Sequence, residues 1–303
     1  MSDRTASEGR GGARGGMRGA LGEALFARVA GPQGPENRRR IHQTPGPRWF
    51  APDRPVRRVH GDASMFVGGL AALLLQSLHP LAMAAVAEHS GFRGDPWGRL
   101  ARTSTFLAVT TFGTADDARQ AVDQVRAIHG RVRGTTPDGT PYRADDPRLL
   151  AWVHIAEVAS FLAAHQRFGA RPLGPAGCDG YLADTARVAE ALGAQDPPRD
   201  RAALAARLRD YRPELRATPE ARETVRYLLR HPPLPWPARP PYALLAANAV
   251  GLLPPWARAE LGLRRPGGVA EPWLVRPGGH LVTGTIRWAM GPGREAAARG
   301  PQP

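Results

Sequence analysis

The stretch that decides the fold class is Asp146–Phe168, DPRLLAWVHIAEVASFLAAHQRF. Asp146 can cap a helix whose first turn then holds Pro147, a position where proline is favoured. Behind this start, apolar side chains recur at helical spacing through Leu149, Leu150, Val153, Val158, Phe161 and Leu162. The stretch therefore predicts one long helix with an apolar face for the protein core.

The remaining chain shows the same helical periodicity and almost no strand-like alternation. We therefore predict an all-α fold built as a single globular helical domain over residues 62–263. Further helices are expected at about 17–30, 64–79, 80–89, 97–112, 114–133, 178–193, 199–214, 218–230, 241–253 and 255–262, with a short ordered piece at 280–290.

The two ends differ from the rest of the chain in composition. Residues 1–16 are rich in Gly, Arg and Ser, which predicts a disordered tail. Residues 17–61 are interpreted as a helix followed by an extended, proline-rich segment lying over the domain. Residues 264–303 are rich in Pro, Gly and Arg, and we expect a second tail there.

The net charge of +14 comes mostly from these ends, and every basic residue is arginine. Residues 1–60 hold 12 Arg against 5 acids, and residues 256–303 hold 7 against 3. This distribution indicates no specific nucleic-acid partner. Cys178 is the single cysteine, and no apolar signal segment is visible, so a cytoplasmic protein is expected. The apolar run Met65–Leu78 is shorter than the ~20 residues of a membrane span, which leaves a core helix or weak membrane-surface association.

His129 is the main candidate for binding a metal or a haem iron. It continues a stripe formed by Ala118, Val122 and Val125 on one face of the helix predicted at 114–133. A neutral imidazole directed toward the core can bind iron through one ring nitrogen. The same spacing also describes a structural core histidine, which is the commoner case.

Arg99 and Thr103 are four residues apart and share a helix face, and Arg102 is adjacent to Thr103. An arginine turned toward the core needs an anionic partner, such as a haem propionate. Arg99 pairing with Asp95, one turn earlier, is the alternative. These three residues are the candidate catalytic set, and Arg99 and Thr103 are also candidates for binding the cofactor.

Three further histidines, His79, His89 and His154, lie in the most apolar third of the chain and are alternative ligands. None has the spacing of a zinc hydrolase motif. Carboxylate di-iron pairs, a Cys-x-x-Cys-His site for covalent haem and a glycine-rich phosphate loop are also missing from the sequence.

Several motifs together resemble the rubber oxygenase (latex clearing protein) and MpaB-type oxygenase family over roughly residues 62–262. They are Leu78-His79-Pro80, Glu88-His89-Ser90, Arg99-x-x-Arg102-Thr103, Phe112-Gly113, Ile128-His129, Tyr142-x-Ala-x-Asp146-Pro147, Trp152-Val153-His154 and Gly251-Leu-Leu-Pro254-Pro255 followed by Leu261-Gly262.

The resemblance implies a globin-reminiscent helical core that holds non-covalent haem b, with His129 as the proximal ligand and Arg99 and Thr103 near the haem. Rubber-cleaving members carry lysine where this chain has Arg102. The resemblance also implies an oxygenase that uses O2, an electron donor and an apolar, isoprenoid-like or lipid-like substrate. A non-catalytic haem or lipid binding or sensor protein of the same fold is the alternative, and a plain helical scaffold or arginine-rich nucleic-acid binder is the third class.

Overall fold

The computed structural model describes residues 5–89, 95–264 and 275–291. They form a mostly helical single domain, which confirms the predicted fold class. A globin-reminiscent arrangement of the helices stays a prediction. The helices and strands are α1 (Thr5–Ala30), α2 (Gly34–Gln43), α3 (Pro55–His60), α4 (Met65–Gln76), α5 (Pro80–His89), α6 (Pro96–Phe112), α7 (Ala115–His129), β1 (Arg133–Thr135), β2 (Pro141–Arg143), α8 (Pro147–Phe168), α9 (Pro175–Leu192), α10 (Arg201–Tyr211), α11 (Pro219–Arg230), α12 (Arg239–Leu252), α13 (Pro255–Glu260) and α14 (Arg276–Met290), with short 3-10 turns η1 (Arg212–Glu214) and η2 (Trp236–Ala238).

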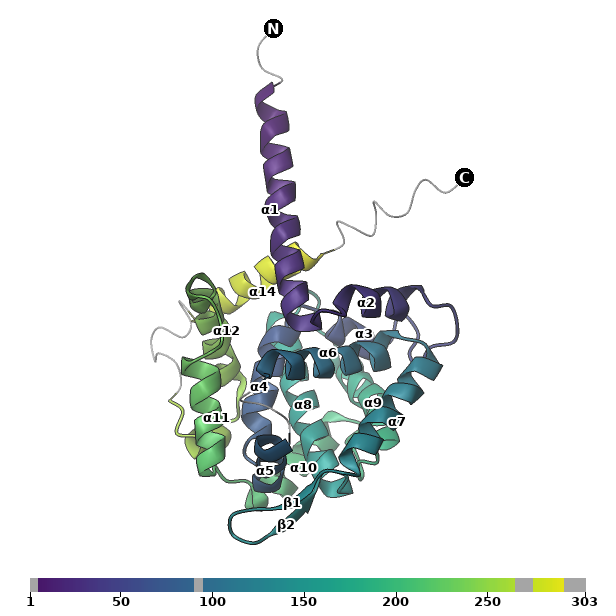
Figure 1. The fold of residues 1–303 in the computed structure, drawn as a ribbon, viewed down its shortest axis with the longest axis vertical. Helices are drawn as coiled ribbons and strands as arrows, with labels where there is room; N and C mark the ends of the chain where they lie inside the picture. Colours follow the sequence, from purple (N-terminus) through teal and green to yellow (C-terminus); the bar gives the residue numbers. More distant parts are fainter. Residues whose placement is uncertain (1–4, 90–94, 265–274, 292–303) are drawn as a thin grey trace.

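Helix α8 is the centre of the core, as its sequence predicts. Trp152 and Ile155 have no exposed surface, and the Trp152 Nε1–H donates to the Gln76 carbonyl oxygen over 3.3 Å. Helix α4 packs closely against α8, because Gly68 leaves room for the α8 main chain at Phe161. In Figure 1, α8 runs through the middle of the domain, with α11 and α12 on one side and α7 on the other.

The predicted helix starts are confirmed where a capping residue marks them. Asp95 accepts a hydrogen bond from the Gly98 N–H at the start of α6, and Thr114 accepts one from Asp117 at the start of α7. Asp146 accepts from two backbone N–H groups in the first turn of α8. These side chains satisfy N–H groups that have no partner inside the helix.

The N-terminal region is more helical than predicted. Helix α1 begins at Thr5, so it includes residues 5–16, which we expected to be disordered. The predicted extended segment contains α2 and α3. That prediction was wrong because prolines were taken as helix breakers, whereas Pro35 and Pro55 stand in first turns, where no N–H is needed.

The region after α7 also differs from the prediction. Helix α7 ends at His129, and β1 and β2 form an antiparallel hairpin in which Gly134 pairs with Tyr142. The residues between the strands contain the sequence Pro137-Asp138-Gly139, which is typical of a turn. Three-residue strands are too short to show the alternation by which a strand is recognised in sequence.

Helix α14 confirms the expected ordered piece at 280–290 and extends it to Arg276. Its Arg287 side chain forms an ion pair with Asp62, 3.0 Å from Nη2 to Oδ1, and donates to the Phe168 carbonyl oxygen. Asn248 on α12 donates to the Val275 carbonyl oxygen at the other end of α14. The last helix is therefore part of the domain rather than of a tail, beyond the expected boundary at residue 263.

Helix α8 is also the one helix of the described residues with the length and apolarity of a membrane span. Its most apolar window is 56 % buried inside the domain. The core helix of a water-soluble protein passes the same test, and α8 has that position here. Helices α4 and α5 pass it only as a pair, and they are bent by 107° relative to each other.

Candidate functional site

A cluster of polar side chains lies among the core helices, centred on His60 at the end of α3. The His60 Nδ1 atom is 2.8 Å from the Thr111 hydroxyl of α6, and its Nε2 atom is 3.3 Å from the Tyr181 hydroxyl of α9. Phe161 of α8 packs edge-on against the His60 ring, with ring centroids 5.7 Å apart. The imidazole therefore connects three helices through its two nitrogens and its face.

Helix α8 adds His154 and Glu157, which are one helical turn apart. The His154 Nε2 atom is buried and has no hydrogen-bond partner among the described residues. Burial lowers the pKa of His154 to about 4, and it lowers the pKa of His60 to about 4 with a further contribution from His154. Both rings are therefore uncharged at neutral pH.

Glu157 and Arg99 are the charged members of the cluster. Burial raises the pKa of the Glu157 carboxyl to about 7, and a hydrogen bond with Gln76 and the Arg99 charge act in the opposite direction. Burial lowers the pKa of Arg99, with the Arg102 charge adding to this and Glu157 opposing it. We call the seven residues the core polar cluster: His60, Gln76, Arg99, Thr111, His154, Glu157 and Tyr181.

The structure separates the three predicted catalytic residues. Arg99 is half-buried and close enough to Glu157 for their charges to interact. Arg102 is 65 % exposed and reaches Asp95, with Nη1 3.5 Å from Oδ2. Thr103 is exposed. The pairing with Asp95 that was the alternative for Arg99 is thus made by Arg102, and of the three residues only Arg99 belongs to the core polar cluster.

His129 is the last residue of α7, where the buried stripe reaches the surface. Ala118 and Val122 are buried, whereas Val125 and His129 are half-buried. Within the described ranges, no residue forms a hydrogen bond or an ion pair with the His129 ring. Burial lowers the pKa of the imidazole, and Asp145 acts in the opposite direction. The ring is therefore neutral at pH 7, with nitrogens that other described side chains do not bind.

The other candidate histidines have partners. His79 is buried against the rings of Trp152 and Tyr211, with Nε2 3.6 Å from a Glu214 carboxylate oxygen. Its buried Nδ1 atom has no partner among the described residues. This packing favours a structural role for His79.

His89, at the end of α5, is part of a second polar group beside the hairpin. Its Nε2 atom is 3.1 Å from the Tyr142 hydroxyl, and that hydroxyl donates to the Glu88 carboxylate. Burial, followed by this hydrogen bond, raises the pKa of Tyr142 to about 12. A Cβ atom at Gly134 would lie 2.4 Å from the Tyr142 hydroxyl oxygen. The Tyr142 phenol can therefore keep this place only if residue 134 is glycine.

Sequence reasoning missed most of the core polar cluster. His60, Gln76, Glu157 and Tyr181 were not among the candidates, because no local motif links positions on α3, α4, α8 and α9. One signal was available: Glu157 is a carboxylate one turn after His154 in the most apolar long helix. Across the part of the chain that the structure describes, no group of three or more His, Cys, Asp or Glu side chains is arranged to hold a metal ion.

Comparison with known proteins identifies one family. The family described as "ER-bound oxygenase mpaB/B'/Rubber oxygenase, catalytic domain" matches residues 57–288. Two similar relatives are the uncharacterized proteins Rv2237 of Mycobacterium tuberculosis and Mb2261 of Mycobacterium bovis. Each is 32 % identical over 173 residues, which cover 55 % of this chain and 67 % of the relative. No solved structure matches significantly. The matched region contains both polar groups and most of α14.

Proposed function

The chain belongs to the ER-bound oxygenase mpaB/B' and rubber oxygenase family, and from this premise we propose that it is a haem b-dependent oxygenase acting on an apolar, isoprenoid-like or lipid-like substrate. His129 carries the proposal. It is a half-buried, neutral imidazole on which no described side chain makes a hydrogen bond or ion pair. An iron ligand requires this state. The resemblance assigns the proximal ligand to the same residue.

The residues present also fit the other needs of a haem. Arg99 is a half-buried cation suited to a carboxylate, the group by which haem propionates are bound. His154, Glu157 and His60 are strongly desolvated yet each keeps some accessible surface. In the proposed complex these side chains would border the haem or its substrate. His154, with its unpartnered Nε2 atom, is the second candidate ligand.

Residues of this chain would bind the substrate, transfer protons and exclude water around a bound haem. When bound, haem supplies activation of dioxygen at its iron. Arg99 would bind and orient a carboxylate. Glu157, with a pKa of about 7, can hold or release a proton at neutral pH. The buried apolar side chains of α4 and α8 would exclude water and accept a lipid-like substrate.

An absorption spectrum with pyridine haemochrome analysis tests the proposal. We expect a Soret band in haem-loaded protein and its loss in His129→Ala. His231→Ala is the matched control, because His231 is exposed and directly follows α11. Loss of the band in His154→Ala alone would move the ligand to His154. Colourless protein after haem loading would refute haem dependence.

Turnover is measured separately from binding. We expect oxygen consumption when haem-loaded protein receives a reductant and an apolar substrate. The same spectrum without oxygen consumption would favour the non-catalytic haem or lipid binding alternative. Cytoplasmic location and the lack of a specific nucleic-acid partner stay predictions.

A further inference from the structure

Helix α14 has two faces of different character. Its inner face packs on the domain through Thr283, Ile286 and Ala289, which are buried. Its outer face carries Leu281, which is 68 % exposed, and Trp288, which is 44 % exposed. They stand seven residues apart, so they lie along the same side of the helix. Large apolar side chains are therefore exposed in a row on a helix that is otherwise well packed.

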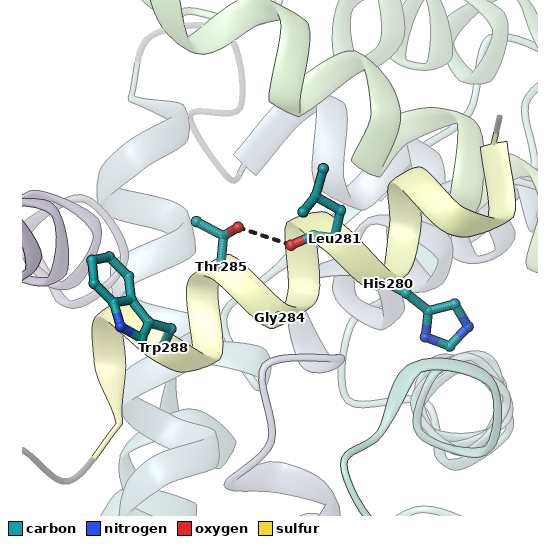
Figure 2. A pocket seen from close by; sticks show the side chains of 5 residues that line it. All are labelled: His280, Leu281, Gly284, Thr285 and Trp288. Atoms are coloured by element: carbon teal, nitrogen blue, oxygen red, sulfur yellow. Dashed lines mark hydrogen bonds between the residues drawn. The ribbon is translucent and has the colours of Figure 1, made fainter.

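The space between these two side chains is a shallow hollow. It has a volume of about 420 Å³ and is lined by His280, Leu281, Gly284, Thr285 and Trp288. Figure 2 shows that the Thr285 hydroxyl donates to the Leu281 carbonyl oxygen one turn earlier, over 2.9 Å. Because that hydrogen bond satisfies the hydroxyl inside the helix, Thr285 adds little polarity to the outer face.

One basic side chain, Arg18, borders this face. Arg18 of α1 donates from Nε to the Trp288 carbonyl oxygen over 2.9 Å, and its guanidinium carbon is 5.7 Å from the centre of the Trp288 ring. The sequences of α1 and α14 together contain six arginines and two glutamates, although Arg287 is directed inward to Asp62. Leu21 of α1, which is 37 % exposed, adds a further apolar side chain. Figure 1 shows α1 projecting from the domain beside α14.

We propose that the outer face of α14, with the adjoining part of α1, docks onto an anionic phospholipid bilayer. Tryptophan and arginine are suited to such an interface, where an apolar ring meets charged headgroups. The side chains of Leu21, Leu281 and Trp288 together expose an apolar area on the order of a few hundred Å². That is less than the ~800 Å² per partner of a stable protein interface. A bilayer needs only shallow insertion of a few side chains together with a positive charge. The proposal does not depend on haem or on turnover.

Vesicle sedimentation of the full chain tests this docking. We expect binding to phosphatidylcholine vesicles that contain phosphatidylserine, weaker binding without phosphatidylserine, and a decrease as salt is added. The double variant Leu281→Ser/Trp288→Ser should reduce the partition coefficient by about tenfold or more. Trp236→Ser is the matched control and should bind like the wild type, because Trp236 is 79 % exposed but lies in η2.

A variant that strengthens binding covers the case in which the double variant fails to fold. Thr285→Leu adds an apolar side chain at an exposed position between Leu281 and Trp288. We expect it to raise the partition coefficient by about threefold or more. Three results would overturn the proposal. They are no sedimentation of the wild type with phosphatidylserine vesicles, equal binding by wild type and both α14 variants, and self-association of the wild type that the double variant abolishes.

Discussion

Replacing Glu157 by glutamine should make the protein more stable at pH 8 and leave its stability at pH 4.5 nearly unchanged. Burial raises the pKa of this carboxyl from 4.5 to about 7 in the folded protein. Between these two pH values the folded protein holds the proton and the unfolded chain has lost it. Stability is therefore lost as pH rises through this window. A pKa change of one unit corresponds to about 1.36 kcal/mol, so a rise from 4.5 to about 7 lowers the free energy of unfolding above pH 7 by about 3 kcal/mol.

The measurement is the free energy of unfolding in urea, taken for wild type and Glu157→Gln at several pH values from 4.5 to 8. His60 and His154, with pKa values lowered to about 4, lose their contribution as pH falls, but wild type and variant share that dependence. We expect the difference between the two proteins to grow toward about 3 kcal/mol in favour of the variant as pH rises.

Glu190→Gln is the matched control. Glu190 is 43 % exposed and forms an ion pair with Arg199, so its replacement should change the free energy of unfolding by less than about 1 kcal/mol. Parallel stability curves for wild type and Glu157→Gln, or a less stable variant at pH 8, would refute the reasoning. Either result would mean that the Glu157 carboxyl is ionised at little cost in the folded protein.

Two further predictions concern contacts that hold separate segments together. The buried Asp184 carboxylate on α9 accepts from Arg54 Nε over 2.8 Å and from the backbone at the start of α3, so Asp184→Ala should lower the free energy of unfolding by about 2–3 kcal/mol in urea titrations; a loss below about 1 kcal/mol would contradict this. Gly134→Ala places a Cβ atom 2.4 Å from the Tyr142 hydroxyl, so the melting temperature should fall by several degrees, about 2–4 °C for each kcal/mol. In Gly251→Ala the new Cβ atom would meet no atom within 4 Å outside its own stretch of helix, so this variant should not lower the melting temperature. An equal fall in both variants would show that the Tyr142 phenol is not the cause.

Local signals in the sequence were enough to predict most of the helices. The starts of α6, α7 and α8 follow from Asp95, Thr114 and Asp146, because a capping hydrogen bond depends on residues two or three positions away. The position of α14 in the domain could not be predicted in this way. Its anchors, Asp62 and the Phe168 carbonyl oxygen, lie 225 and 119 residues earlier in the chain.

In the candidate site, too, the sequence predicts the features that depend on local spacing and not those that depend on tertiary packing. His129 follows from the periodicity of α7, and a partner for Arg99 could be expected from the cost of burying an unpaired cation. The interaction of the Arg99 charge with Glu157 depends on how the fold brings α6 and α8 near each other, which no spacing within α6 shows. Thr111 and Tyr181 bind His60 across 51 and 121 residues of chain. Such contacts are made by tertiary packing and leave no pattern in a single sequence.

The packing of α14 against the rest of the domain also affects how the protein folds during its synthesis. The residues of α12 that face this helix, among them Asn248, are complete in the nascent chain before residues 276–290 have been synthesised. Until residues 276–290 leave the ribosome, Asp62 cannot pair with Arg287 and the α12 surface stays open to water or to chaperones. The domain therefore completes its folding only after α14 has been synthesised, well after its central helix α8 has emerged.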